Sequence, residues 1–304
     1  MGRQWRSAVA HTRTRMGEAL FRRVAGPSGP VNRDRIHLTP GPRWFPAGGP
    51  VQRVHADAAL FVGGIAALLL QSLHPLAMAA VAEHSDYRED PWGRLQSIST
   101  FLAFTTYGTA EDAQRAVDRV KAVHRTVRGT APGGEPYAAA DPVLLEWVHD
   151  AEVSCFLGAH QRYGARRLGP AEQDEYVAGM ARVGAALGVR EPPRTVAELG
   201  ARLRAYRPRL RGTPQAREAA RFLLRRPPVP WPLRPPYAAL AAAAVDLLPE
   251  WARAELGLRP RLPVERRFTR LAGGAAVRLV GWVLRTPPGT PRRPGHGRSA
   301  RPSR

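Results

Sequence analysis

Five histidines of this 304-residue chain, four of them on or beside apolar helix faces, could carry chemistry: His74, His84, His124, His149 and His160. A neutral imidazole in a dry pocket offers one nitrogen lone pair to a metal, which is what haem iron requires of its protein ligand. A single histidine on an apolar helix face is more often a satisfied core residue. Five in one region of the chain favour a ligand or cofactor site.

The first two of these histidines belong to the stretch LLLQSLHPLAMAAVAEHSDYREDPWGRL, residues 68–95. The apolar segment of residues 56–82 is long enough to suggest a transmembrane helix. However, Gln71, His74 and Pro75 interrupt it, and a proline disfavours helical geometry at the residue before it. We therefore predict two helices that break at His74 and are buried in protein, and no integral membrane span.

Residues 109–128 predict a helix that has Thr109 as its N-cap. His124 lies seven residues after Val117 and four after Val120, so we predict it in the middle of the apolar face. That face consists of the residues that recur at helical spacing, namely Ala113, Ala116, Val117, Val120, Val123 and Val127.

Asp141 and Pro142 predict the start of another helix, with the aspartate as N-cap and the proline in the first turn. Cys155 is the only cysteine of the chain. It has no neighbouring base and is interpreted as a small core residue. A single cysteine excludes internal disulfides, and a reducing cytoplasm is the expected location. The predicted inner face of this helix is formed by Leu145, His149, Phe156 and His160.

Two metal chemistries remain open. Haem carries two propionates, so its pocket needs a cation, and Arg94 follows the turn that begins at His84. A non-haem metal site built from His84, His149 and nearby carboxylates is the alternative. Glu146 and His149 form one Glu-x-x-His pair, but no convincing second pair accompanies it, which disfavours a di-iron bundle. The chain contains no nucleophile elbow, Gly-rich phosphate loop, H-E-x-x-H or paired C-x-x-C motif.

The formal net charge of +21 suggests nucleic-acid binding, but its distribution argues against it. Residues 46–189 hold twelve basic and sixteen acidic residues, a sum of −4. The excess lies in residues 1–45 (+7), in residues 190–235 (+9), in residues 236–285 (+4) and in the last 19 residues (+5). We expect no nucleic-acid partner. The first 20 residues lack the apolar core of a secretory signal, although such an Arg-rich amphipathic start could touch a membrane surface.

We predict an all-α fold with a single multi-helix domain. No segment shows the alternating β-branched residues that are typical of a β-strand, and no hairpin signal such as Asn-Gly is present. The predicted organisation is a basic, partly irregular lead-in (1–45), a helical domain (46–285) and a disordered basic tail (286–304). Within the lead-in, residues 24–50 are rich in Pro and Gly and are expected to be irregular.

Three ordered motifs resemble the MpaB/rubber oxygenase catalytic-domain family, which includes the latex-clearing proteins. They are LLLQSLHPLAMAAVAEHSDYREDPWGRL, FTTYGTAEDAQRAVDRVKAVHRTVRGT and GEPYAAADPVLLEWVHDAEVSCFL, and the later LLPEWARAELGL is also similar. The resemblance extends over residues 50–285. It implies an all-α domain that resembles the globin-like helical core of the latex-clearing proteins. It also implies haem b as cofactor and dioxygen as co-substrate. Characterised members cleave carbon–carbon double bonds of isoprenoids, so a small apolar substrate is expected.

The resemblance also implies residue roles. His124 corresponds to the axial haem ligand and Arg94 to an arginine that holds haem. His74 and His84 are predicted at the catalytic pocket and His149 as a further cofactor contact. Two positions depart from the family, because Ser97 replaces a lysine that can reach the iron in latex-clearing proteins and Ile98 replaces a threonine.

Three other functions remain as alternatives. The first is a non-catalytic helical protein that binds haem or a lipid. The second is the non-haem metal enzyme described above. The third is a basic accessory protein that acts through its arginine-rich segments. The sequence makes no prediction of the substrate or of the oligomeric state.

Overall fold

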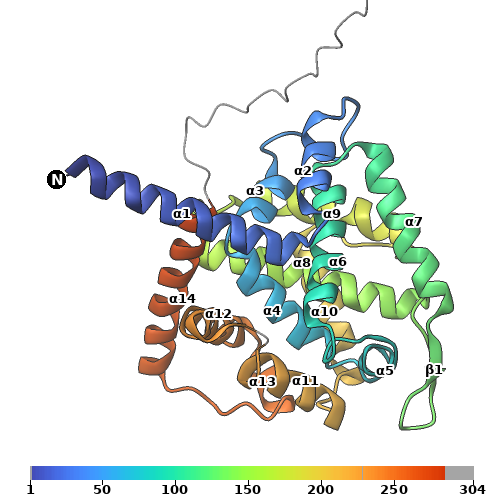
Figure 1. Cartoon of the computed structure of the whole chain (residues 1–304). Coiled ribbons are helices and arrows are strands. Elements are labelled where there is room, and N and C mark those ends of the chain that lie inside the picture. The colour runs from blue at the N-terminus through green and yellow to red at the C-terminus, as the bar shows by residue number, and fades with distance from the viewer. Residues whose placement is uncertain (1, 228, 285–304) are drawn as a thin grey trace, which may run out of the picture.

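The computed structural model describes residues 2–227 and 229–284, with side chains from residue 10 onward. The chain is all-α, as predicted (Figure 1). The predicted disordered tail of residues 286–304 lies outside the described residues. The fourteen α-helices of the described residues are α1 (Gly2–Ala25), α2 (Gly29–Leu38), α3 (Pro50–Ala56), α4 (Leu60–Gln71), α5 (Pro75–His84), α6 (Pro91–Tyr107), α7 (Ala110–Thr126), α8 (Pro142–Tyr163), α9 (Pro170–Leu187), α10 (Val196–Tyr206), α11 (Pro214–Arg225), α12 (Arg234–Leu247), α13 (Glu250–Glu255) and α14 (Pro263–Leu284).

The centre of the molecule is the packing of α4 along α8. Gly63 allows this approach, because a Cβ at that position would lie 3.0 Å from the Cα of Phe156. Trp147 and Ala151 of α8 are fully buried in the same cluster as Leu69 of α4. Burial of these large apolar side chains is the main source of stability at this contact.

The predicted break at His74 is confirmed. His74 has extended geometry (φ −82°, ψ 114°), and Pro75 occupies the first turn of α5. No single described helix is long and apolar enough to cross a membrane. Helices α3 and α4 reach the required length and composition only as a pair, and they are bent by 91° at their break.

The predicted N-caps are also confirmed. The Thr109 hydroxyl accepts a hydrogen bond from the Asp112 amide (3.1 Å) at the start of α7. The Asp141 carboxylate accepts one from the Val143 amide (2.9 Å) at the start of α8. Each cap satisfies an amide that has no partner within its helix.

Two segments differ from the sequence predictions. Residues 29–38, expected to be irregular, form α2, which has Pro30 in its first turn. A short antiparallel hairpin, β1 (Arg128–Thr130) and β2 (Pro136–Ala138), follows α7 where no strand was predicted. Its turn depends on Gly134, whose φ of +86° is a conformation that favours glycine.

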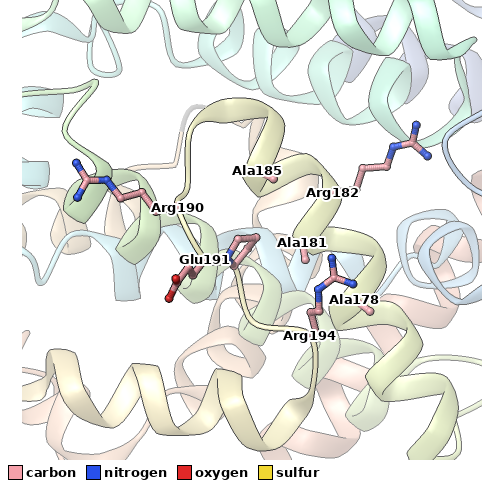
Figure 2. Close-up of a pocket in the computed structure, with 8 residues that line it drawn as sticks. Ala178, Ala181, Arg182, Ala185, Arg190, Glu191 and Arg194 are labelled. Atoms are coloured by element: carbon pink, nitrogen blue, oxygen red, sulfur yellow. The ribbon is translucent and has the colours of Figure 1, made fainter.

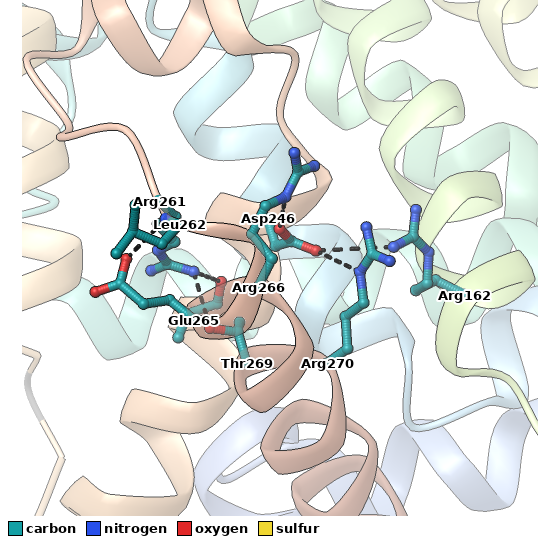
Figure 3. Close-up of polar contacts among 9 residues, drawn as sticks. Arg162, Asp246, Arg261, Leu262, Glu265, Arg266, Thr269 and Arg270 are labelled. Atoms are coloured by element: carbon teal, nitrogen blue, oxygen red, sulfur yellow. Dashed lines mark hydrogen bonds and ion pairs between the residues drawn. The ribbon is translucent and has the colours of Figure 1, made fainter.

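Helix α14 is fastened to the rest of the protein by one buried carboxylate. The Asp246 side chain is fully buried on α12 and faces three arginines (Figure 3). Its oxygens lie 3.0 Å from Arg266 Nε, 3.1 Å from Arg270 Nε and 3.7 Å from Arg162 Nη1. Burial by itself would raise the pKa of Asp246, but hydrogen bonds from Arg270 and Arg266 outweigh it and hold the pKa below its usual value.

We predict that Asp246→Asn lowers the free energy of unfolding by about 2–4 kcal/mol, because three arginines lose their shared counter-ion. Urea unfolding followed by circular dichroism measures the change. Asp34→Asn is the matched control, since Asp34 is 64% exposed and faces Arg33 at 3.9 Å, and its effect should stay within about 0.5 kcal/mol. Equal midpoints for the two variants would contradict the proposed role of Asp246.

Candidate functional site

The connection between α5 and α6 presents Arg94. Helix α6 begins after Asp90, whose carboxylate caps the Gly93 amide at 2.9 Å. This places Arg94 in the first turn of α6, where its guanidinium donates a hydrogen bond to the Ser85 hydroxyl. Arg94 is half-buried and has no carboxylate partner among the described residues. A guanidinium stays charged at all ordinary pH values, so this position offers a fixed cation.

His84, at the end of α5, is tied to the hairpin. Its Nε2 lies 3.1 Å from the Arg128 carbonyl oxygen. A carbonyl only accepts, so Nε2 carries the proton and Nδ1 is the accepting nitrogen. The ring also meets Tyr137 edge to face at 6.1 Å, and the Tyr137 hydroxyl donates to Glu83. His84 itself is exposed.

His124 lies in the last turn of α7, at the edge of the buried face. Val123, which the predicted apolar face includes, is 60% exposed, whereas His124 itself is half-buried. The buried residues of α7 all lie in its first half, between Asp112 and Val117. The second half extends beyond that packing to reach the hairpin (Figure 1).

The imidazole of His124 is nevertheless partly enclosed. Its Nδ1 atom is buried and has no hydrogen-bond partner in the described structure. Burial lowers the pKa of His124 below its ordinary value. The ring is therefore neutral near pH 7 and has an enclosed nitrogen that no protein group uses.

His149 lies in the buried interior of α8. A Cβ at Gly184 of α9 would lie 2.8 Å from its Nε2, so the ring packs directly on the α9 backbone. Burial first, and the charge of Arg202 second, lower the pKa of His149 to about 4. This imidazole too is neutral under ordinary conditions.

His74 occupies the break between α4 and α5. It is buried, its Nδ1 has no hydrogen-bond partner in the described residues, and its ring lies 6.4 Å from that of Tyr206. Burial, followed by the charge of Arg209, lowers the pKa of His74 to about 4. The Tyr206 hydroxyl donates to the Val143 carbonyl at 2.9 Å, so this region is held against the start of α8.

The predicted residues form two groups. His84 and Arg94 lie on either side of the α5–α6 connection, and Arg128, the partner of His84, comes four residues after His124. His74 and His149 lie deeper, against α10 and α9. The last turns of α9 link the groups, because Gly184 touches His149 and the Ala186 carbonyl accepts a hydrogen bond from Lys121 at 3.3 Å, one turn before His124.

His160 and Cys155 have structural roles. His160 Nε2 lies 3.0 Å from the Arg166 carbonyl oxygen, and its ring is buried on α8. Burial, with the nearby Glu152 carboxylate as a second cause, raises the pKa of the Cys155 thiol to about 12. A thiol in this state is a poor nucleophile and a poor metal ligand.

A second buried polar cluster was missed by the sequence analysis. His55 of α3 is buried, and its Nδ1 lies 2.7 Å from the Thr106 hydroxyl, while its Nε2 has no described partner. The ring of Tyr176 lies 6.0 Å away and its buried hydroxyl is also without a described partner. Glu152 interacts electrostatically with Tyr176. The i, i+3, i+4 spacing of Val51, Val54 and His55 is a signal in the sequence that could have indicated this burial.

An open groove of about 700 Å³ lies elsewhere, between α9 and residues 190–194. Its floor includes Ala178 and Ala185, and Arg182, Arg190 and Arg194 line it. Figure 2 shows Arg190 extending away from Arg194, on the far side of Glu191, so the three cations do not converge on one point. None of the predicted site residues lines this groove.

Among the described residues, no three of His, Cys, Asp and Glu converge closely enough to hold a metal ion. The alternative non-haem site of His84 and His149 therefore gains no support from the geometry. A haem ligand needs only a single enclosed neutral imidazole, which His124 offers, and the propionates need a cation, which Arg94 offers.

Residues 52–282 match the family described as ER-bound oxygenase mpaB/B′/rubber oxygenase, catalytic domain. No curated protein and no solved structure matches the chain.

The second cluster gives a prediction for pH-dependent stability. Burial raises the pKa of Glu152 to about 7, from an ordinary value of 4.5. The unfolded chain thus releases this proton at lower pH than the folded chain, and stability falls as the pH rises from about 4.5 to about 7. In Glu152→Gln this loss is absent. Between pH 4 and pH 8 the unfolding free energy of the variant should therefore gain on the order of 3 kcal/mol relative to that of the wild type.

Urea unfolding at a series of pH values measures this difference. Glu135→Gln, at an exposed position in the hairpin turn, serves as the control and should follow the wild-type pH profile. A Glu152→Gln profile parallel to that of the wild type would show that the carboxyl is not held in its protonated form.

Proposed function

The chain belongs to the family of mpaB and rubber oxygenase catalytic domains, and from this premise we propose that it is a haem b-dependent oxygenase acting with dioxygen on a small apolar substrate. The family identifies an oxygenase domain, hence an oxidoreductase. The observation that supports haem is the enclosed Nδ1 of His124, which has no hydrogen-bond partner in the described structure. The apolar substrate is proposed to be an isoprenoid or secondary-metabolite alkene that undergoes oxidative cleavage of a double bond.

His124 is proposed as the axial ligand of the haem iron. Only the neutral imidazole has a lone pair for a metal, and burial keeps His124 neutral. An unpaired buried nitrogen costs free energy unless some group binds to it. Haem, when bound, supplies the redox chemistry, and the protein supplies ligation, orientation and a dry pocket.

Arg94 is proposed to bind a haem propionate. Its guanidinium can form paired hydrogen bonds with a carboxylate, a geometry that lysine cannot provide. The bond to Ser85 uses one of its five N–H groups and holds the side chain in position. The remaining donors are available to an anionic group.

An apolar lining is proposed along α6. Leu95, Ile98 and Phe101 remain half-buried although they belong to a helix that other helices cover. The neutral rings of His74 and His149 would add little charge to such a pocket. A pocket of this composition favours an apolar ligand.

His74 and His84 are proposed as catalytic-pocket residues. His84 is suited to accept a proton at Nδ1, since its Nε2–H is already donated to Arg128. The Ser97 hydroxyl donates to the Gly93 carbonyl of its own helix at 3.0 Å. It is therefore occupied and shorter than the lysine found at this position in latex-clearing proteins, so we propose that Ser97 would not reach bound haem iron as that lysine can.

The first test is the absorption spectrum of the protein expressed with sufficient iron and haem precursor. We predict a Soret band that is lost or shifted in His124→Ala, because the axial ligand is removed. His37→Ala, which changes an exposed histidine of α2, is the control and should keep the wild-type spectrum. No Soret band after reconstitution with haem would overturn the proposal, and a band unchanged in His124→Ala would move the ligand to another histidine.

Dioxygen uptake then separates an oxygenase from a carrier. The haem-loaded wild type should consume dioxygen in the presence of isoprenoid alkenes and release carbonyl products. A stable Soret band without uptake on any alkene would favour the non-catalytic haem-binding alternative.

Arg94 gives a separate prediction. Arg94→Ala should weaken haem binding by roughly tenfold to a hundredfold, since hydrogen bonds to a charged group are worth about 1.5–3 kcal/mol. Haem titration followed at the Soret maximum measures the affinity. Arg88→Ala is the control, because Arg88 lies in the same connection but pairs with Glu218 at 3.0 Å. Equal affinities for the two variants would exclude a propionate contact at Arg94.

A further inference from the structure

Helix α14 exposes an unusual amount of apolar surface. The described chain has fifteen large hydrophobic residues that are exposed, and seven of them belong to α14 or directly precede it. A contiguous apolar patch on a protein surface marks an interaction site more often than scattered apolar residues do. The seven residues are Leu262, Val264, Phe268, Leu271, Leu279, Trp282 and Leu284.

The exposed residues follow the spacing of one helical face. Val264, Phe268 and Leu271 are spaced by four and three residues, and Leu279 and Trp282 extend the stripe two turns further. We call this stripe, from Val264 to Trp282, the outer face of α14.

The opposite side of α14 is firmly attached, so the outer face is not a misplaced core face. Gly273 packs against α12, where a Cβ would lie 2.6 Å from that of Ala243. Ala276, Val277 and Val283 are buried. The Asp246 ion pairs described above hold the first half of the helix (Figure 3).

Positive charge flanks this face. Arg267 and Arg278 are exposed on α14, and the only acidic residue of the helix, Glu265, is paired with Arg259 at 2.8 Å. Helix α1 contacts the C-terminal end of α14, where the Arg13 guanidinium lies 5.6 Å from the centre of the Trp282 ring (Figure 1). Residues 2–25 contain six arginines and one glutamate.

We propose that the outer face of α14 docks onto an anionic lipid bilayer, with the helix axis in the plane of the surface. An apolar stripe with Phe and Trp, bordered by arginines, is typical of helices that lie in the membrane interface. The arginines attract anionic headgroups while the apolar side chains enter the acyl boundary. A second copy of this chain is a poorer occupant, because two equally basic faces would repel one another.

Co-sedimentation of the full chain with lipid vesicles tests the proposal. The wild type should sediment with vesicles containing about one third phosphatidylglycerol and remain in solution with phosphatidylcholine alone. The double variant Phe268→Ser, Leu271→Ser should bind the anionic vesicles at least roughly tenfold more weakly than the wild type, since its apolar anchors are removed.

The control is Val31→Ser, Leu38→Ser on α2. These residues are 70% and 65% exposed, against 69% and 61% for Phe268 and Leu271, so both variants remove similar apolar surface. The control should bind vesicles as the wild type does. Thermal unfolding equal to that of the wild type verifies that both variants are folded. The sedimentation assay then tests docking independently of the haem proposal.

Three outcomes would overturn the proposal. If the wild type does not sediment with anionic vesicles, the face does not bind lipid. If both double variants bind as the wild type does, the arginines alone carry the adhesion. If light scattering finds a wild-type dimer that the α14 variant converts to a monomer, the face belongs to a second copy of the chain.

Discussion

The burial of α8 on every side is the constraint on which the candidate site depends. Gly63 of α4 allows close approach on one side, and Gly184 of α9 allows it on another. Ionisable groups on α8 are consequently taken out of water. Burial is the first cause of the lowered pKa of His149 (about 4) and of the raised pKa of Asp150 (about 6) and Glu152 (about 7). The interior around α8 therefore favours uncharged groups, which suits an apolar ligand.

The break at His74 organises the other half of the site. Pro75 ends α4 and starts α5 in a new direction, which carries His84 to the hairpin and Arg94 to the first turn of α6. The break leaves backbone groups without helical partners, and the Arg211 amide satisfies the Leu73 carbonyl at 2.8 Å. Part of the basic 190–235 region thus acts inside the fold.

The arginines of that region also serve as counter-ions. Arg202 Nε lies 2.8 Å from the buried Asp150 carboxylate, and Arg207 Nη2 lies 3.3 Å from Glu255. An unpaired carboxylate at the Asp150 position would be costly. The high arginine content of the chain is therefore partly a requirement of its buried acids, and only the remainder is available for a surface partner.

What could be predicted from sequence is local in origin. The helix break at Pro75 and the caps at Thr109 and Asp141 depend on adjacent residues, so the pattern alone indicates them. The site was harder to place, because whether an apolar face is covered depends on distant segments. Val123 continues the apolar period of α7 and is nevertheless 60% exposed.

Long-range contacts could not be predicted for the same reason. His55 forms a hydrogen bond with Thr106, which is fifty-one residues away in the sequence. Asp246 accepts one from Arg270, which is twenty-four residues away. The residues adjacent to these positions in the sequence do not predict either contact. These contacts nevertheless determine which polar groups are buried and how α14 is held.

The attachment of α14 connects the two proposals. Asp246 fixes the inner side of the helix, so its apolar outer face cannot turn inward without breaking the ion pairs of Arg266 and Arg270. An apolar alkene of the kind proposed as substrate dissolves poorly in water and collects in membranes, because its transfer from water is favourable. A protein held at the bilayer by α14 would meet such a substrate at a far higher local concentration than in solution. The exposed apolar surface, a liability for a protein surrounded by water, would then have a physical purpose.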